Sequence, residues 1–142
     1  MVRRMDIPAA STPIVCDMTT APDTEDERLA EYRRLFSEVL VGRERTETGI
    51  RFRFHANPGV EAWVCDLAAR EKACCAFFAF EISVVGQEVV WDMAVVDNDM
   101  ARAILDQFYE LPVTLANNFD DVRDRFADLG LEVISQGSVR LS

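Results

Sequence analysis

The chain has 142 residues, which is enough for one ordinary domain and too few for two. Hydrophobic residues make up 49% of it and charged residues 28%, a balance typical of folded globular proteins rather than disordered ones. The formal net charge is −10 and no basic stripe occurs, so the surface would repel a phosphate backbone. We therefore expect no nucleic-acid partner.

The residues at the N-terminus contain no apolar run of signal-peptide length, and no other stretch is long enough to span a membrane. We therefore expect a cytoplasmic protein without a membrane partner, in which thiols stay reduced. The four cysteines, Cys16, Cys65, Cys74 and Cys75, then suit free thiols, metal ligands or redox centres better than a disulfide framework. The chain has a single histidine, His55, which makes a conventional histidine-rich metal site or a Ser-His-Asp triad hard to build.

Residues 1–12 are predicted to form a flexible leader, and residues 13–142 a single domain. The first element of this domain is a short strand at residues 13–18, PIVCDM. Thr24 and Glu27 then have the spacing of a capping box at a helix start. Apolar residues recur at helical intervals over about four turns, which predicts an amphipathic helix. They are Leu29, Tyr32, Leu35, Phe36, Val39 and Leu40.

The middle of the chain predicts strands on both sides of a second helix. Residues 49–55, GIRFRFH, alternate between apolar and polar, as a strand with one buried face does. Asn57 followed by Pro58 indicates the start of a helix that extends to about Phe77. The segments FEISVV and EVVWDMAV flank Gly86-Gln87 and predict an antiparallel hairpin.

Two further helices are predicted in the last third of the chain. The first is capped by Asp97 or Asn98 and ended by Pro112. The second is capped by Asn118 and ended by Gly130.

The chain then closes with one or two strands, at residues 131–135 and 138–141. The resulting order, β-α-β-α-β-β-α-α-β, indicates an α+β domain with a mainly antiparallel sheet and helices packed on one face. For its topology we expect a ferredoxin-like variant with an extra C-terminal helix-strand segment. An exposed strand edge of such a sheet would allow a homodimer.

One segment, residues 71–80 with the sequence EKACCAFFAF, places a carboxylate and two thiols among apolar residues. On the predicted helix Glu71 lies on the apolar face, and it precedes Cys74 by three residues and Cys75 by four. These are the separations at which helical side chains meet. A buried carboxylate keeps its proton or needs a partner, because desolvation disfavours its charge. Glu71, Cys74 and Cys75 are therefore the candidate catalytic or metal-ligating residues.

The first hypothesis for this group is that it binds a thiophilic metal or metalloid ion, or a small electrophilic ligand. Adjacent cysteines diverge by about 100° on a regular helix, which disfavours a single zinc ion. A soft ion of low coordination, or arsenite, suits the pair better, especially if Cys16 on the first strand supplies a third sulfur. Glu71 would then be a further ligand or a proton acceptor.

Two alternatives use the same residues differently. In a small enzyme, Cys74 or Cys75 would be a nucleophile or redox thiol that acts on an organic ligand, with Glu71 as its proton acceptor. In a binding or dimerisation module, the cysteines would be inert and would only pack in the core. Cys65 lies on a different helical face and is expected to be structural, and His55 is expected to be exposed.

Several aromatic side chains suit a hydrophobic core, and they could also line an apolar ligand pocket between the sheet and the helices. The candidate pocket residues are Phe52, Phe54, Phe78, Trp91 and Met93.

Residues 71–80 also resemble a small, mostly uncharacterised bacterial domain whose mark is a helix ending in E-x-x-C-C-x-F-F-x-F, followed by a strand and hairpin. The resemblance covers roughly residues 13–110, with Ala76 where proline is expected. That domain occurs alone and with MerR-type regulators and heavy-metal functions. The resemblance implies functional roles for Glu71, Cys74 and Cys75 and packing roles for three aromatic residues. These are Phe77, Phe78 and Phe80.

Overall fold

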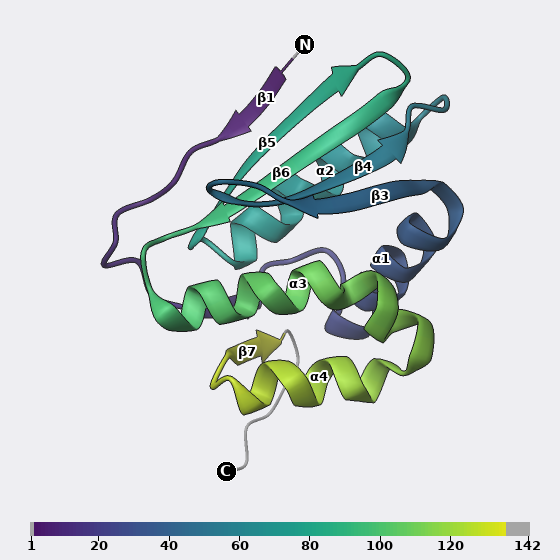
Figure 1. Ribbon diagram of the computed structural model, residues 1–142. Coiled ribbons are helices and arrows are strands. Elements are labelled where there is room, and N and C mark those ends of the chain that lie inside the picture. The colour runs from purple at the N-terminus through teal and green to yellow at the C-terminus, as the bar shows by residue number, and fades with distance from the viewer. Residues whose placement is uncertain (1, 136–142) are drawn as a thin grey trace.

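The computed structural model describes residues 2–135, which form four helices and seven strands (Figure 1). In chain order these are β1 (Val2–Met5), β2 (Val15–Met18), α1 (Glu25–Val39), β3 (Leu40–Arg45), β4 (Gly49–His55), α2 (Val60–Cys74), β5 (Phe78–Val85), β6 (Glu88–Val95), α3 (Asp99–Asn117), α4 (Phe119–Asp128) and β7 (Glu132–Ser135). The second closing strand, predicted at 138–141, lies outside the described residues. Within residues 2–135 no helix is both long and apolar enough to cross a membrane.

Five strands form one antiparallel sheet in the order β1-β5-β6-β4-β3. A second, two-stranded sheet pairs β2 with β7 in parallel, with Cys16 opposite Val133. In Figure 1, α4 and β7 lie below α3, on the side away from the large sheet. This arrangement confirms the predicted α+β class, the mainly antiparallel sheet and the extra C-terminal helix-strand segment.

The large sheet buries one face and exposes the other, as the alternation in residues 49–55 predicts. Ile50, Phe52 and Phe54 of β4 have no exposed surface. Between them, Arg51 points to the opposite face and forms an ion pair with Asp92 of β6 at 2.7 Å. Each buried aromatic or aliphatic side chain contributes about 1.5–3 kcal/mol to folding, so this alternation fixes which face the helices cover.

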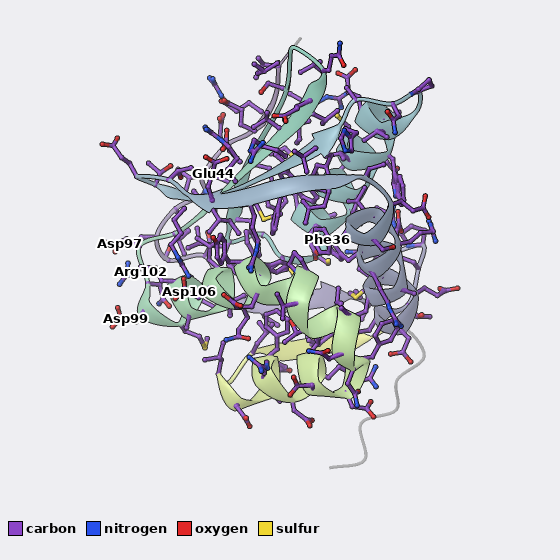
Figure 2. The ribbon with its side chains drawn as sticks, turned by 45° about the vertical axis from the view of Figure 1, so that its right-hand side comes forward. Phe36, Glu44, Asp97, Asp99, Arg102 and Asp106 are labelled. Carbon is purple, nitrogen blue, oxygen red and sulfur yellow. The ribbon has the colours of Figure 1, made fainter. Side chains whose placement is uncertain are left out.

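Aromatic contacts join the helices to the buried face of the sheet. The ring of Phe36 from α1 lies 5.2 Å from the ring of Phe52, and Phe108 from α3 lies 4.9 Å from Phe78 of β5. Figure 2 shows Phe36 in the interior, whereas Asp99 and Arg102 project from the surface near the start of α3. The core therefore lies between one face of the sheet and the helices.

The ferredoxin-like expectation applies to one unit of the sheet. Strands β4 and β5 run in the same direction on either side of β6, and α2 connects them as a split β-α-β unit. The other crossover, from β1 through α1 to β3, joins the two opposite edges of the sheet. The two units therefore do not interleave as they do in a ferredoxin-like fold.

Part of the segment predicted as a flexible leader, residues 1–12, is a strand in the structure. Val2–Met5 forms β1, which pairs with the edge of β5, and Arg4 donates to a carboxylate oxygen of Glu81 at 3.0 Å. The sequence VRRM has no apolar alternation, so it gave no strand signal. Residues 2–5 form a strand because the backbone groups along the edge of β5 are free to pair with an extended segment beside them.

Helix boundaries also differ from the predictions at three places. α1 ends at Val39, and the unpredicted strand β3 begins at once with Leu40. α2 begins at Val60 rather than at Pro58, because Gly59 at its N-cap has a φ of 87°, which is a left-handed conformation. It ends at Cys74 rather than near Phe77.

α3 continues through Pro112 to Asn117, although proline was expected to end it. Leu111 and Leu115 are buried on the core side of this helix, and their packing outweighs one missing backbone hydrogen bond. The predicted cap at Asn98 is confirmed, since its side chain accepts a hydrogen bond from the Ala101 amide.

Two other predicted helix starts are also confirmed. Asn118 caps α4 and accepts from the Asp120 amide. Thr24 and Glu27 form the predicted capping box at the start of α1.

Candidate functional site

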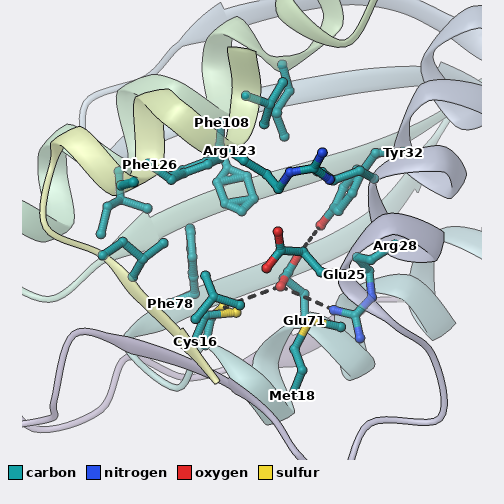
Figure 3. A pocket seen from close by; sticks show the side chains of 18 of the residues that line it. Cys16, Met18, Glu25, Arg28, Tyr32, Glu71, Phe78, Phe108, Arg123 and Phe126 are labelled. Carbon is teal, nitrogen blue, oxygen red and sulfur yellow. Dashed lines mark hydrogen bonds and ion pairs between the residues drawn. The ribbon is translucent and has the colours of Figure 1, made fainter. Parts of the chain in front are cut away.

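Four potential metal ligands meet inside the protein, beside the helical side of the large sheet. They are the Sγ atoms of Cys16, Cys74 and Cys75 and a carboxylate oxygen of Glu71, and all lie within 4.8 Å of one another. Each of the four residues is at least nine-tenths buried. Figure 3 shows Glu71 and Cys16 from this group, with Arg28 and Tyr32 around the Glu71 carboxylate. The structure thus brings together every residue that was predicted as a possible metal ligand.

The end of α2 explains why the adjacent cysteines converge. Cys74 is the last helical residue, and Cys75 leaves the helix with φ −120° and ψ 72°. The Cys75 amide still donates to the Glu71 carbonyl at 2.7 Å. The two Sγ atoms are only 3.9 Å apart, and each lies 3.4 Å from Oε2 of Glu71. The predicted divergence of about 100° does not arise, because only one of the two cysteines is helical.

The third sulfur comes from the small sheet. Cys16 lies in β2, which contacts α2 and is held by its parallel pairing with β7. Its Sγ atom lies 3.8 Å from that of Cys74 and 2.7 Å from that of Cys75. A residue that is 58 positions from Cys74 in the chain therefore completes the group through tertiary packing.

α1 supplies a cation and a hydroxyl that the sequence analysis did not single out. Tyr32 donates a hydrogen bond of 2.6 Å to Oε1 of Glu71. Arg28 lies 3.3 Å from Oε2 of Glu71 and 3.4 Å from the Sγ atom of Cys74. Both residues are buried, and their i,i+4 spacing puts them on one helical face. The sequence did contain a signal for Arg28, because this arginine lies beside the apolar stripe of α1. In the same way, Glu71 interrupts the apolar stripe of α2.

Ion pairs connect Arg28 to the surface of the protein. Asp23 accepts two hydrogen bonds from Arg28, at 2.7 and 2.8 Å, and a third from Arg70 at 3.0 Å. Arg70 also binds both carboxylate oxygens of Glu31, at 2.7 and 2.8 Å. Bidentate contacts of this kind fix the plane of a guanidinium, so Arg28 is held facing the sulfur cluster.

The surroundings separate the three thiols by their acidity. Hydrogen bonds from Cys16 and Cys75, together with the Arg28 guanidinium, lower the pKa of Cys74. The hydrogen bond to Cys74 raises the pKa of Cys16, and burial raises the pKa of Cys75. Burial and the nearby charge of Cys74 raise the pKa of Glu71 to about 7. These surroundings therefore favour the ionised form of Cys74 over those of Cys16 and Cys75.

Most of the distances between pairs of these ligand atoms, the edges of a tetrahedral site, fit a four-coordinate ion. An ion bonded to sulfur at about 2.3 Å and to oxygen at about 2.1 Å sets S–S edges near 3.8 Å and S–O edges near 3.5 Å. The edges of Cys74 to Cys16, Cys75 and Oε2 of Glu71 are 3.8, 3.9 and 3.4 Å. The edge from Cys75 to Oε2 of Glu71 is also 3.4 Å, whereas the 2.7 Å edge between Cys16 and Cys75 is too short. These two sulfurs must separate by about 1 Å when an ion enters.

An apolar cavity of about 290 Å³ lies directly beside the cluster. Glu71, Cys16 and Cys75 form part of its wall, and aromatic rings from β5, α3 and α4 form much of the rest (Figure 3). Of the five predicted pocket residues, Phe78 lines this cavity. The other four lie in the closed core instead, each with 2% exposure or less. They are Phe52, Phe54, Trp91 and Met93.

The remaining candidates lie apart from the cluster. Cys65 is a half-buried residue of α2 and does not belong to the group of converging ligands. His55 is exposed at the end of β4, as expected.

Comparison with known proteins finds no matching family model, no similar curated protein and no similar solved structure.

We expect mild oxidation to join Cys16 and Cys75 in an intramolecular disulfide. Their sulfurs are closer than van der Waals contact, and the distance needed for a bond is about 2.05 Å. With diamide as oxidant, each thiol loses a proton and the pair loses two electrons. Intact mass and peptide mapping check the link, with Cys65→Ser as control. A disulfide between Cys74 and Cys75, or between chains, would contradict this expectation.

Proposed function

We propose that this domain binds one thiophilic metal or metalloid ion through Cys16, Cys74 and Cys75, with Glu71 as fourth ligand or proton acceptor. One observation carries the proposal, namely three buried sulfurs and a carboxylate oxygen within 4.8 Å of one another. Buried thiols are common singly, but packing alone does not require three of them to meet around a carboxylate. The heavy-metal association implied by the E-x-x-C-C-x-F-F-x-F resemblance agrees with this role.

The chemistry of the ligands favours a soft ion over a hard one. Thiolates select ions such as Cu(I), Zn(II) and related thiophilic species, whereas Mg²⁺ and Ca²⁺ require oxygen ligands. Three thiolates around a divalent ion leave one negative charge, which the Arg28 guanidinium offsets at 3.4 Å from Cys74. The thiolate of Cys74 provides the first bond, and the other thiols release their protons as the ion enters.

The enzyme alternative has one observation in its favour. The cation that a reactive thiolate needs is present as Arg28, from α1 rather than from the sheet. Cys74, the thiol that this cation activates, does not line the apolar cavity. An organic substrate in the cavity would meet Cys16 and Cys75, whose pKa values are raised. Ion binding therefore uses all three thiols, whereas a substrate in the cavity would face the two thiols whose pKa values are raised.

Native mass spectrometry of the reduced protein tests this function. Spectra are recorded as purified and after addition of Zn(II), Cu(I), Hg(II) or arsenite. We expect at least one ion to bind one-to-one in the wild type and in Cys65→Ser. In Cys16→Ser, Cys74→Ser and Cys75→Ser its affinity should fall about 100-fold or more, because a chelating ligand is lost. Thermal unfolding confirms that each variant is folded.

The result that overturns the proposal is equally definite. If no ion binds the wild type, or if Cys74→Ser and Cys75→Ser bind every ion as tightly as Cys65→Ser, the cluster is not a metal centre. The cysteines would then be packing residues, as in the third hypothesis from the sequence.

A further inference from the structure

We propose that the natural ligand is a soft metalloid or metal atom that carries one apolar organic group, such as an aryl arsenic(III) compound. Cys16 and Cys75 would hold the soft atom, and the organic group would fill the adjacent cavity. The inference rests on the proposed function, because it uses the same thiols, and it names the class of ligand that they would bind.

The first observation is the position of each thiol relative to the cavity. Cys16 and Cys75 line it together with Glu71 and Arg28, whereas Cys74 is not among the lining residues. A soft atom bonded to Cys16 and Cys75 would therefore have one side facing the cavity. A substituent on that side would enter apolar space, whereas a free hydroxyl on that side would lose its hydration.

The second observation is the size and lining of the cavity. A bare ion bound by the thiols would leave this cavity of about 290 Å³ unfilled. Cavities of about 150 Å³ that are lined by leucine, isoleucine and phenylalanine stay dry and bind benzene. Phe78, Phe108 and Phe126 contribute rings to this wall, and Leu111 and Val122 contribute aliphatic groups. The same wall includes polar residues, so it is mainly but not wholly apolar; they are Glu25, Arg28, Tyr32, Glu71 and Arg123. The space is ample for one phenyl ring with aromatic and aliphatic contacts on several sides.

The chemistry balances without any oxidant or reductant. An aryl arsenic(III) dihydroxide reacts with two thiols, so that two As–S bonds replace two As–O bonds. Each thiol proton joins one departing hydroxide, and two water molecules leave. Arsenic stays trivalent. Glu71 Oε2, at 3.4 Å from the Sγ atom of Cys75, is placed to pass a proton from thiol to hydroxide.

The expected selectivity follows from the number of bonds and the buried area. Phenyl and methyl arsenic(III) compounds form the same two As–S bonds, so their affinity ratio measures the cavity alone. Burial of a phenyl ring in place of a methyl group should favour the phenyl compound by about 10- to 100-fold. Arsenite forms three As–S bonds, so Cys74→Ser should weaken arsenite about 100-fold and the phenyl compound only a few-fold.

The test is a competition titration with phenylarsine oxide, methyl arsenic(III) and arsenite, with dithiothreitol as the reference dithiol. Wild-type protein should prefer phenyl over methyl at least 10-fold more than dithiothreitol does. Val122 is buried and lines the cavity from α4, so Val122→Phe should remove this preference and leave arsenite binding unchanged. Val122→Ala, which enlarges the cavity, should retain it. Arsenite binding in each variant shows that the site is folded.

Each outcome separates the two proposals. If arsenite and methyl arsenic(III) bind but phenyl is not preferred, the ligand-class inference is wrong and the ion-binding function stands. A preference that survives unchanged in Val122→Phe also overturns the inference, because the ring would then lie elsewhere. If none of the arsenic compounds and none of the metal ions binds, both proposals fail.

Discussion

The variant Arg28→Met is expected to lose about 3–5 kcal/mol in the free energy of unfolding, measured without added metal. Arg28 and Glu71 form a buried ion pair, with 4% and 5% of their side chains exposed. Removal of the cation leaves the Glu71 carboxylate buried beside Cys74 with Tyr32 and the Cys75 thiol as its neutral donors. Losing one partner of such a pair costs more than the pair contributed, because the remaining group cannot regain its hydration.

Urea or thermal unfolding measures this loss, with Arg33→Met as the matched control. Arg33 is an exposed arginine of the same helix, so its substitution should cost less than about 1 kcal/mol. The double variant Arg28→Met/Glu71→Gln should recover part of the loss, since it removes the uncompensated acid as well. An Arg28→Met loss no larger than that of Arg33→Met would show that Glu71 and Cys74 do not depend on this cation.

Deletion of residues 131–142 is expected to reduce arsenite affinity about 100-fold or more, as Cys16→Ser does. Within the described residues, β7 is the one strand that pairs with β2, and Cys16 is opposite Val133. Without β7 nothing in the small sheet holds Cys16 against α2. Leu131 and Val133 also line the cavity beside the cluster, so its wall would open to water.

Addition of Cys16→Ser to the shortened chain provides the decisive comparison. If β7 acts by holding Cys16, the substitution should cause no further loss of affinity, because the third sulfur is already displaced. Circular dichroism should show that the large sheet and helices α1 to α3 are retained, since none of the five strands of the large sheet pairs with β7. A further loss on adding Cys16→Ser would mean that Cys16 stays in place without β7, contrary to expectation.

The sequence by itself determined the elements whose signals are local. Residues 49–55 alternate so regularly that the strand and its buried face follow from the pattern. The capping box of Thr24 and Glu27 and the caps at Asn98 and Asn118 follow from side-chain chemistry within one turn. Elements of this kind depend on no distant residue, so the predicted and observed structures agree at these positions.

The sequence also determined the helical half of the candidate site. Glu71 and Cys74 are three residues apart on an apolar face, and helix geometry alone brings a carboxylate and a thiol together at that spacing. Cys75 shows the limit of this reasoning, because its position depends on where the helix ends. The apolar pattern predicted a helix to about Phe77, whereas the helix ends at Cys74.

Only the tertiary structure decided the remaining parts. The pairing of β2 with β7 brings Cys16 to the cluster, and side-chain contacts from α1 bring Arg28 and Tyr32 to Glu71. β1 forms because the edge of β5 was free, and the cavity exists because α3 and α4 stand beside the thiols. Each of these contacts joins segments far apart in the chain, and no local periodicity encodes the partner of such a contact. The sequence determined which residues could carry the chemistry, and long-range packing decided which of them meet.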